Sequence, residues 1–152
     1  MDINDLARTL GESFLESLPE PVWVKDLGHR YVAVNVAFRR LCEYQAGGTE
    51  LEVIDVTDFN LFPLEIAEQS LQEELDVMTT REAKRGELYI FNLEGQARQF
   101  ETRRMALLDD SGAAIGTLGM AFDVTDQAQH LLQVGESECQ LSQLVGKLPV
   151  VA

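Results

Sequence analysis

The chain has 152 residues, of which 45% are hydrophobic, and its formal net charge is -14. This length suits one compact domain with some additional helix, and no apolar run approaches the ~20 residues that a membrane-spanning helix needs. Because nucleic-acid binders need clustered Lys and Arg, the acidity argues against a nucleic-acid partner. Cys42 and Cys139 form no CxxC pair, which argues against a zinc site and a disulfide framework. The first residues also lack the apolar stretch of a secretory signal, so we expect a cytoplasmic protein without membrane insertion in this segment and without a metal site.

The first predicted element is an amphipathic helix over residues 1–18. Its apolar side chains recur every three or four positions and include Leu6, Leu10 and Phe14, which places them on one stripe. The Pro-Glu-Pro segment that follows ends the helix. Because an exposed apolar stripe favours association, we expect these three residues either to cover the sheet or to pair with a second copy in a homodimer.

A hairpin and a capped helix come next. Residues 22–24 and 31–34 are predicted to be strands joined by a Leu27-Gly28-His29 turn, in which glycine supplies conformational freedom. Asn35 occupies the N-cap position of a helix over residues 36–44. His29 in the turn and His130 further along are expected to face solvent. Residues 45–63 are predicted to be irregular, with short helical turns only.

The longest predicted helix covers residues 64–80. Its apolar residues at helical spacing are Ile66, Ala67, Leu71, Leu75 and Met78. The side chains expected to face water are Glu65, Glu68, Gln72, Glu73 and Asp76. The sequence therefore predicts an apolar stripe that packs on the core and a polar face that is solvated.

Three strands are predicted to complete the domain, over residues 88–93, 98–108 and 114–122. A Glu94-Gly95-Gln96 turn joins the first pair, and Asp109-Asp110-Ser111-Gly112 joins the second. The predicted order is therefore two strands, several helices and three strands.

This order of elements, together with six short motifs, resembles the PAS family. The motifs are Leu18-Pro19-Glu20-Pro21-Val22, Lys25-Asp26-Leu27-Gly28, Asn35-Val36-Ala37-Phe38, Leu61-Phe62-Pro63, Arg103 through Asp109 with Gly112, and Asp123-Val124-Thr125-Asp126. Each motif alone is weak, but their order and spacing together are specific. The resemblance implies an α+β fold over residues 19–126, with a five-stranded antiparallel sheet that carries helices on one face.

The resemblance also implies a ligand cavity between the sheet and the helices. The candidate pocket residues are Trp23, Asn35, Phe38, Phe62, Phe91, Phe100 and Met120. Core packing and helix capping explain the same residues without a ligand. Haem is disfavoured because haem-binding relatives carry a histidine on the long helix, and residues 64–80 contain none. Flavin is possible but unsupported, since Cys42 lies outside the Asn-Cys-Arg-Phe-Leu motif of light-sensing relatives, so the cofactor stays unknown.

The end of the last strand is the candidate output point. Asp123-Val124-Thr125 resembles the motif that joins a PAS core to its output helix, so Asp123 and Thr125 are implied to transmit the signal, although a simple helix cap explains them too. A connecting helix over residues 127–147 follows, with coiled-coil-like spacing. Leu148-Pro149 repeats Leu18-Pro19 one domain length later, which predicts that residues 148–152 begin a second PAS-like domain.

The sequence contains no recognisable pairing of nucleophile and base, no metal cluster and no phosphate-binding glycine loop, so we do not expect an enzyme. The resemblance implies a sensory domain that binds a small ligand or dimerises and signals to downstream domains of the same chain. The implied output is a histidine kinase of a two-component system, or a diguanylate cyclase or phosphodiesterase of cyclic-di-GMP signalling. The alternative is a ligand-free module for protein interaction and dimerisation.

Overall fold

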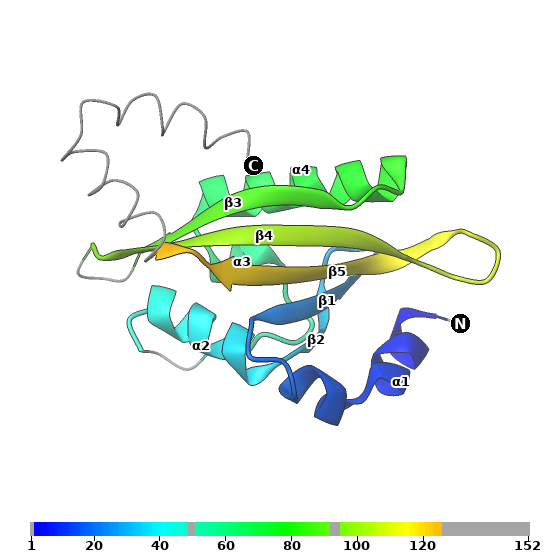
Figure 1. Cartoon of the computed structure of the whole chain (residues 1–152), viewed down its shortest axis with the longest axis horizontal. Helices are drawn as coiled ribbons and strands as arrows, with labels where there is room; N and C mark the ends of the chain where they lie inside the picture. Colours follow the sequence, from blue (N-terminus) through cyan, green and yellow to red (C-terminus); the bar gives the residue numbers. More distant parts are fainter. Residues whose placement is uncertain (1, 49–50, 92–94, 126–152) are drawn as a thin grey trace.

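The computed structural model describes residues 2–48, 51–91 and 95–125. Five strands form one antiparallel sheet in the order β2-β1-β5-β4-β3 (Figure 1). The strands are β1 (Val22–Asp26), β2 (Tyr31–Val34), β3 (Lys84–Phe91), β4 (Ala97–Leu108) and β5 (Ala114–Asp123). The helices in these ranges are α1 (Ile3–Glu16), α2 (Val36–Gln45), α3 (Asp58–Leu61) and α4 (Leu64–Thr80). The predicted α+β architecture is therefore confirmed.

The sheet has two differently covered faces. On the inner face, α4 packs against β3, β4 and β5, and α2 packs against β1 and β3. The buried core lies here and includes Trp23, Phe38 and Phe100. Because side chains alternate along a strand, the residues beside Trp23 point to the outer face, where α1 contacts β1 and Ile3 packs against Gly116 of β5.

Local hydrogen bonds explain where the first hairpin turns and where α2 begins. The Asp26 carboxylate accepts the backbone N–H groups of Gly28 and Arg30, which closes the turn in the manner of an Asx motif. His29 rather than Gly28 takes the left-handed conformation, with φ 65°, so the conformational freedom predicted to come from the glycine is not used at this turn. At the end of β2, the Asn35 side-chain oxygen accepts the N–H of Phe38, so the predicted N-cap is confirmed.

The ends of several elements differ from the prediction, most clearly in α1 and β3. Helix α1 ends at Glu16 and is interrupted at Gly11, whose φ of 72° is not helical; glycine adopts this conformation at low cost. Strand β3 begins at Lys84 rather than Leu88, because the polar residues 84–87 pair with β4. Their polarity hid the strand from the sequence pattern. The predicted connecting helix (127–147) and second domain (148–152) lie outside the described residues.

The buried face of α4 is polar, which corrects the prediction for this helix. Ala67, Ser70, Glu73, Glu74 and Val77 are buried, whereas Leu75 is 43% exposed. These buried positions still follow helical spacing, but they are rotated away from the expected leucine stripe. Charged side chains can occupy this face because Lys25 and Arg104 reach them from the sheet, and a buried charge needs such a partner.

Candidate functional site

A small cavity lies between α4 and the inner face of the sheet. Its volume is about 20 Å³, which is enough for about one water molecule. Its apolar wall is formed by Trp23, Phe38, Phe62, Ile66 and Leu88. Its polar wall is formed by Tyr31, Asp58, Gln69, Ser70, Glu73, Glu87, Thr102 and Arg104. The cavity is therefore an aromatic space with charged groups on one side.

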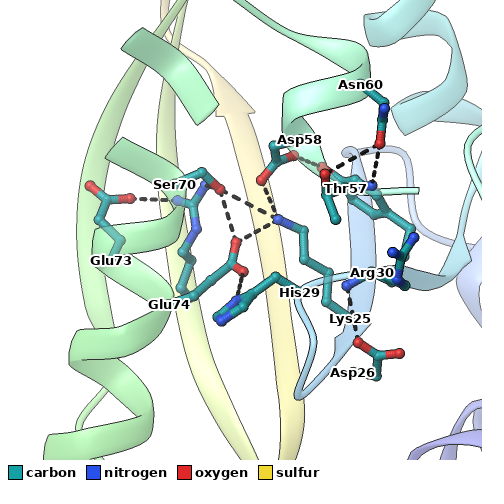
Figure 2. Close-up of polar contacts among 12 residues, drawn as sticks. Lys25, Asp26, His29, Arg30, Thr57, Asp58, Asn60, Ser70, Glu73 and Glu74 are labelled. Carbon is teal, nitrogen blue, oxygen red and sulfur yellow. Dashed lines mark hydrogen bonds and ion pairs between the residues drawn. The ribbon is translucent and has the colours of Figure 1, made fainter. Parts of the chain in front are cut away.

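Lys25 of β1 is the centre of the charged cluster (Figure 2). Its side chain is fully buried, and its ammonium group donates to Asp58 and, at 2.5 Å, to Glu74. These carboxylates come from α3 and α4, so one lysine ties both helices to the sheet. A buried ion pair gives little net stability, because desolvation offsets its Coulomb energy, but breaking it is costly.

The two carboxylates beside Lys25 have further donors. The Tyr31 hydroxyl donates to Asp58, and Ser70 donates to Glu74 at 2.9 Å. His29 Nδ1 lies 2.9 Å from the other oxygen of Glu74, with the histidine side chain only 22% exposed. The expectation that His29 faces solvent is therefore wrong, because the left-handed turn brings its ring back over α4.

A second ion pair lies beside the first. Arg104 of β4 donates to Glu73 at 2.6 Å and to Ser70 at 3.0 Å. Ser70 thus joins the two ion pairs, since it also bonds to Glu74. The cluster contains three carboxylates and two basic side chains, counted here by their formal charges. It therefore carries one formal negative charge when His29 is neutral.

The electrostatics of the cluster are reflected in two pKa values. Burial alone would raise the pKa of Glu74, but the hydrogen bond with His29 and the charge of Lys25 outweigh it and lower the pKa from 4.5 to about 2. Burial, followed by the neighbouring Asp58 charge, raises the pKa of Tyr31 well above 10.0. Glu74 is therefore ionised and Tyr31 is a neutral donor across the physiological pH range.

Two polar atoms at the cavity have no partner among the described residues. They are the hydroxyl of Thr102 and the Nε of Arg104. Both residues point inward from β4, and their side chains are more than nine-tenths buried. Because most buried polar groups in proteins are hydrogen-bonded, each such exception calls for a physical explanation.

Three of the predicted pocket residues line the cavity. Trp23, Phe38 and Phe62 form its aromatic wall, with ring centroids 5.2 Å apart for Trp23 and Phe38, and 6.5 Å apart for Phe38 and Phe62. Phe100 is buried in the adjoining core but does not line the cavity. Met120 lies between the buried residues Gly119 and Ala121 of β5, so its side chain points to the outer face and away from the cavity.

Asn35 has a structural position rather than a place in the cavity wall. Its oxygen accepts the N–H groups of Val22 and Phe38. Its amide nitrogen donates to the carbonyls of Leu15 and Glu20. One buried asparagine therefore joins α2, β1 and the segment after α1. The side chain of Phe91, another predicted pocket residue, lies outside the described part of the structure.

The predicted dimerisation residues lie on the short N-terminal helix. Phe14 is 51% exposed and Leu6 is half-buried. The side chain of Leu10 is outside the described residues. Among the side chains described in this helix, the buried apolar ones are Ile3 and Leu15, which are not among the predicted dimerisation residues.

The predicted output residues form a compact junction at the end of β5. Asp123 accepts from Arg98 at 2.5 Å and from the N–H of Thr125 at 3.0 Å. The Thr125 hydroxyl accepts the N–H of Gln99 at 2.8 Å, and Val124 donates its N–H to the Gln99 carbonyl. The chain therefore leaves the sheet fastened to the start of β4.

Sequence reasoning missed the charged cluster: Lys25, Asp58, Glu73, Glu74 and Arg104. One signal was available, because Lys25 stands two residues after Trp23 in a short apolar strand and must share its face. A lysine on the core side requires carboxylate partners. Nothing in a single sequence shows that the partners come from α3 and α4, because that depends on how the helices cross the sheet.

Within residues 2–48, 51–91 and 95–125, no cluster of three His, Cys, Asp or Glu side chains is arranged to hold a metal ion. None of the described helices combines the length and the apolar character needed to cross a bilayer.

The antiparallel five-stranded sheet, with helices over one face and a small cavity beneath α4, defines an α+β domain. The chain belongs to the PAS fold family, whose pattern matches residues 15–129. PAS domains are generally sensory, non-catalytic modules. Among curated proteins, the sequence comparison found no match.

Several solved structures share the fold. The PAS domain of a Colwellia psychrerythraea protein is 17% identical with a TM-score of 0.60, over 82% of this chain and 99% of that chain. The Vibrio cholerae VqmA dimer, a LuxR-type receptor studied without its target DNA, is 25% identical with a TM-score of 0.64, and the match covers 76% of this chain and 51% of the VqmA chain. A phage VqmA–DPO complex is 24% identical with a TM-score of 0.67, and the match covers 87% of this chain and 59% of the phage VqmA chain. The chain thus spans between half and three fifths of these two VqmA chains.

Proposed function

We propose that this PAS domain binds a small molecule in the cavity beneath α4 and passes the signal through its C-terminal segment to a downstream domain. The observation that carries the proposal is the pair of unpartnered buried atoms, the Thr102 hydroxyl oxygen and Arg104 Nε, whose residues line an aromatic cavity. A ligand that pairs with both groups would offset the cost of burying them. The VqmA structures support the idea, since VqmA, 25% identical to this chain in one such structure, has been solved bound to DPO.

Strand β4 offers a direct path from the cavity to the output junction. Thr102 and Arg104 lie on this strand, as does Gln99, which bonds to Thr125. A ligand that shifts β4 changes the geometry of that bond and hence the direction in which the chain leaves the sheet. On this proposal Asp123 and Thr125 are coupling residues, and the receiving domain is a histidine kinase or a cyclic-di-GMP enzyme.

We further propose a homodimer in the cytoplasm, where an unpaired thiol such as that of Cys42 stays reduced. The dimer proposal is supported by large apolar side chains that are half exposed, including Phe14 on α1 and Met105 on β4. Sedimentation of the full chain tests it, and a monomeric mass across the concentration range would reject it.

The ligand proposal is tested by extracting the purified full chain under denaturing conditions and analysing the extract by mass spectrometry and absorbance. Ile66→Trp fills the cavity from α4 and is expected to abolish the recovered small molecule. Leu75→Trp makes the same type of change at an exposed site on the same helix and is expected to leave recovery unchanged. A wild-type extract without a stoichiometric compound, together with no compound that binds the cavity in solution, rejects the proposal.

The second candidate function is a ligand-free interaction and dimerisation module. The small cavity favours it, because a space of about 20 Å³ is far below the ~300 Å³ or more of typical ligand pockets. On this view the side chains already fill the core and the outer face binds a partner. Equal stability and equal dimerisation of wild type and Ile66→Trp would support this function over ligand sensing.

A further inference from the structure

We infer that the cavity selects a small, planar, uncharged compound whose hydrogen-bonding atoms pair with Arg104 Nε and the Thr102 hydroxyl. This inference rests on the proposed function and adds the chemical class of the ligand. The unpartnered Nε–H of Arg104 can only donate, so the ligand must offer an acceptor such as a carbonyl oxygen or a ring nitrogen. The Thr102 hydroxyl can donate or accept, so the neighbouring group of the ligand can be either a second acceptor or an N–H donor.

The charge of the cluster argues against an anionic ligand. Arg104 is already neutralised by Glu73, and Lys25 by two carboxylates. A carboxylate or phosphate would add to an existing excess of negative charge in a site where water does not screen it. An uncharged acceptor can use the free N–H without that cost.

The buried carboxylates of the cluster do not favour a cationic ligand either, because their oxygens already accept hydrogen bonds. Asp58 accepts from Lys25 and Tyr31, and Glu74 accepts from Lys25, Ser70 and His29. In addition, two of the aromatic faces already carry the protein's own cations: Lys25 lies 4.6 Å from the Tyr31 ring and Arg104 lies 5.5 Å from the Trp23 ring. A cation would have to displace one of these groups.

The aromatic wall argues for a flat ligand. Trp23, Phe38 and Phe62 contact one another in tilted and edge-on arrangements, and aromatic rings pack well against a further ring in offset or edge-to-face geometry. Since the cavity has room for about one water molecule, even a single ring has to widen it. The half-buried Phe62 and Ile66 lie where α3 leads into α4, so ligand entry would displace this junction.

A matched series of single-ring probes tests the inference on the full chain. Benzamide is the uncharged planar acceptor, benzoate its anionic analogue, benzamidine its cationic analogue, and toluene the analogue without polar atoms. Each is titrated into ¹⁵N-labelled protein, and the dissociation constant is taken from the amide shifts of Thr102, Arg104 and α4. We expect benzamide to bind most tightly and benzoate and benzamidine to bind at least several-fold more weakly.

Two valine substitutions separate a hydrogen bond from a packing effect. Thr102→Val removes the cavity hydroxyl and is expected to weaken benzamide by roughly 3- to 10-fold, as for one lost hydrogen bond, while leaving toluene unchanged. Thr117→Val is the control, because Thr117 has an equally buried, unpartnered hydroxyl that does not line the cavity. It should leave both affinities unchanged.

The outcomes distinguish a wrong ligand class from a cavity that binds no ligand. If benzoate or benzamidine binds as tightly as benzamide, or if Thr102→Val has no more effect than Thr117→Val, the ligand class is wrong although the cavity binds ligands. If none of the four probes shifts the cavity amides at millimolar concentration, and no compound is recovered by extraction, the proposed function itself fails.

Discussion

Replacing Lys25 by methionine is expected to be among the most destabilising single changes in this domain. Methionine has a similar shape but no charge, so Lys25→Met leaves Asp58 and Glu74 buried without their common cation. Removing one partner of a buried ion pair costs ~3–5 kcal/mol. Tyr31, Ser70 and His29 still donate to these carboxylates, which places the expected loss toward the lower end of that range.

Urea denaturation followed by far-UV circular dichroism measures this loss. With a slope of ~2 kcal/mol per M, a loss of ~3 kcal/mol lowers the midpoint by ~1.5 M. Lys84→Met is the control, because Lys84 pairs with Asp76 at 2.6 Å but both side chains are about 40% exposed. It should cost less than ~1 kcal/mol. Equal effects of the two substitutions would refute the claim that burial makes the Lys25 cluster important.

The same cluster predicts how stability depends on pH. The pKa of Glu74 falls from 4.5 to about 2 on folding, so its contribution of about 3 kcal/mol is complete above pH 4.5. This contribution is lost as the pH falls from 4.5 toward 2, because the unfolded chain then binds the proton more readily. Glu74→Gln should flatten that part of the stability curve, and an unchanged acid limb would contradict the assigned role of Glu74.

Three further predictions follow from single side chains. Asn35→Ala removes a helix cap and the buried or partly buried bonds to Val22, Leu15 and Glu20, and it should cost ~3 kcal/mol in urea denaturation. A loss below ~1 kcal/mol would show that these bonds contribute little to stability. Gly119→Ala would place a methyl group against the ring of Trp23, and this overpacking should cost ~1–3 kcal/mol. Because Trp23 is the one tryptophan of the sequence, its displacement should shift the fluorescence emission to the red, and unchanged emission would show that the ring did not move. Burial, followed by the Asp58 charge, raises the pKa of the Cys42 thiol to about 12. Peptide mapping after iodoacetamide treatment at pH 8 should therefore find Cys42 labelled only in urea, and rapid labelling of the native protein would contradict its burial.

Sequence patterns predicted the elements whose signals are local. Asn35 starts α2, the first hairpin turns at the predicted residues 27–29, and α4 has the predicted bounds, Leu64 to Thr80. The start of β3 was missed because residues 84–87 are polar, and their strand character comes from pairing with β4. Local chemistry thus predicts the turns and caps, whereas the start of β3 depends on its pairing with β4.

The candidate site was only half predictable, for a physical reason. The aromatic residues Trp23, Phe38 and Phe62 were found because apolar residues in strands and helices mark the core. The acidic residues Glu73 and Glu74 look like solvated positions in a sequence with 26 acidic residues. Their burial depends on cations that reach them from β1 and β4, and such long-range pairing leaves no periodic pattern.

Amide hydrogen exchange at the output junction tests whether occupancy of the cavity changes the hydrogen bonds where the chain leaves the sheet. The N–H of Gln99 bonds to Thr125, and the N–H of Val124 bonds to Gln99, so both report on that junction. We predict that saturation with the compound recovered by extraction, or with benzamide, changes the exchange rate of both amides severalfold, and that Ile66→Trp removes the response. Exchange that changes at the amides of Thr102 and Arg104 but not at those of Gln99 and Val124 would show that the cavity and the output junction are not coupled.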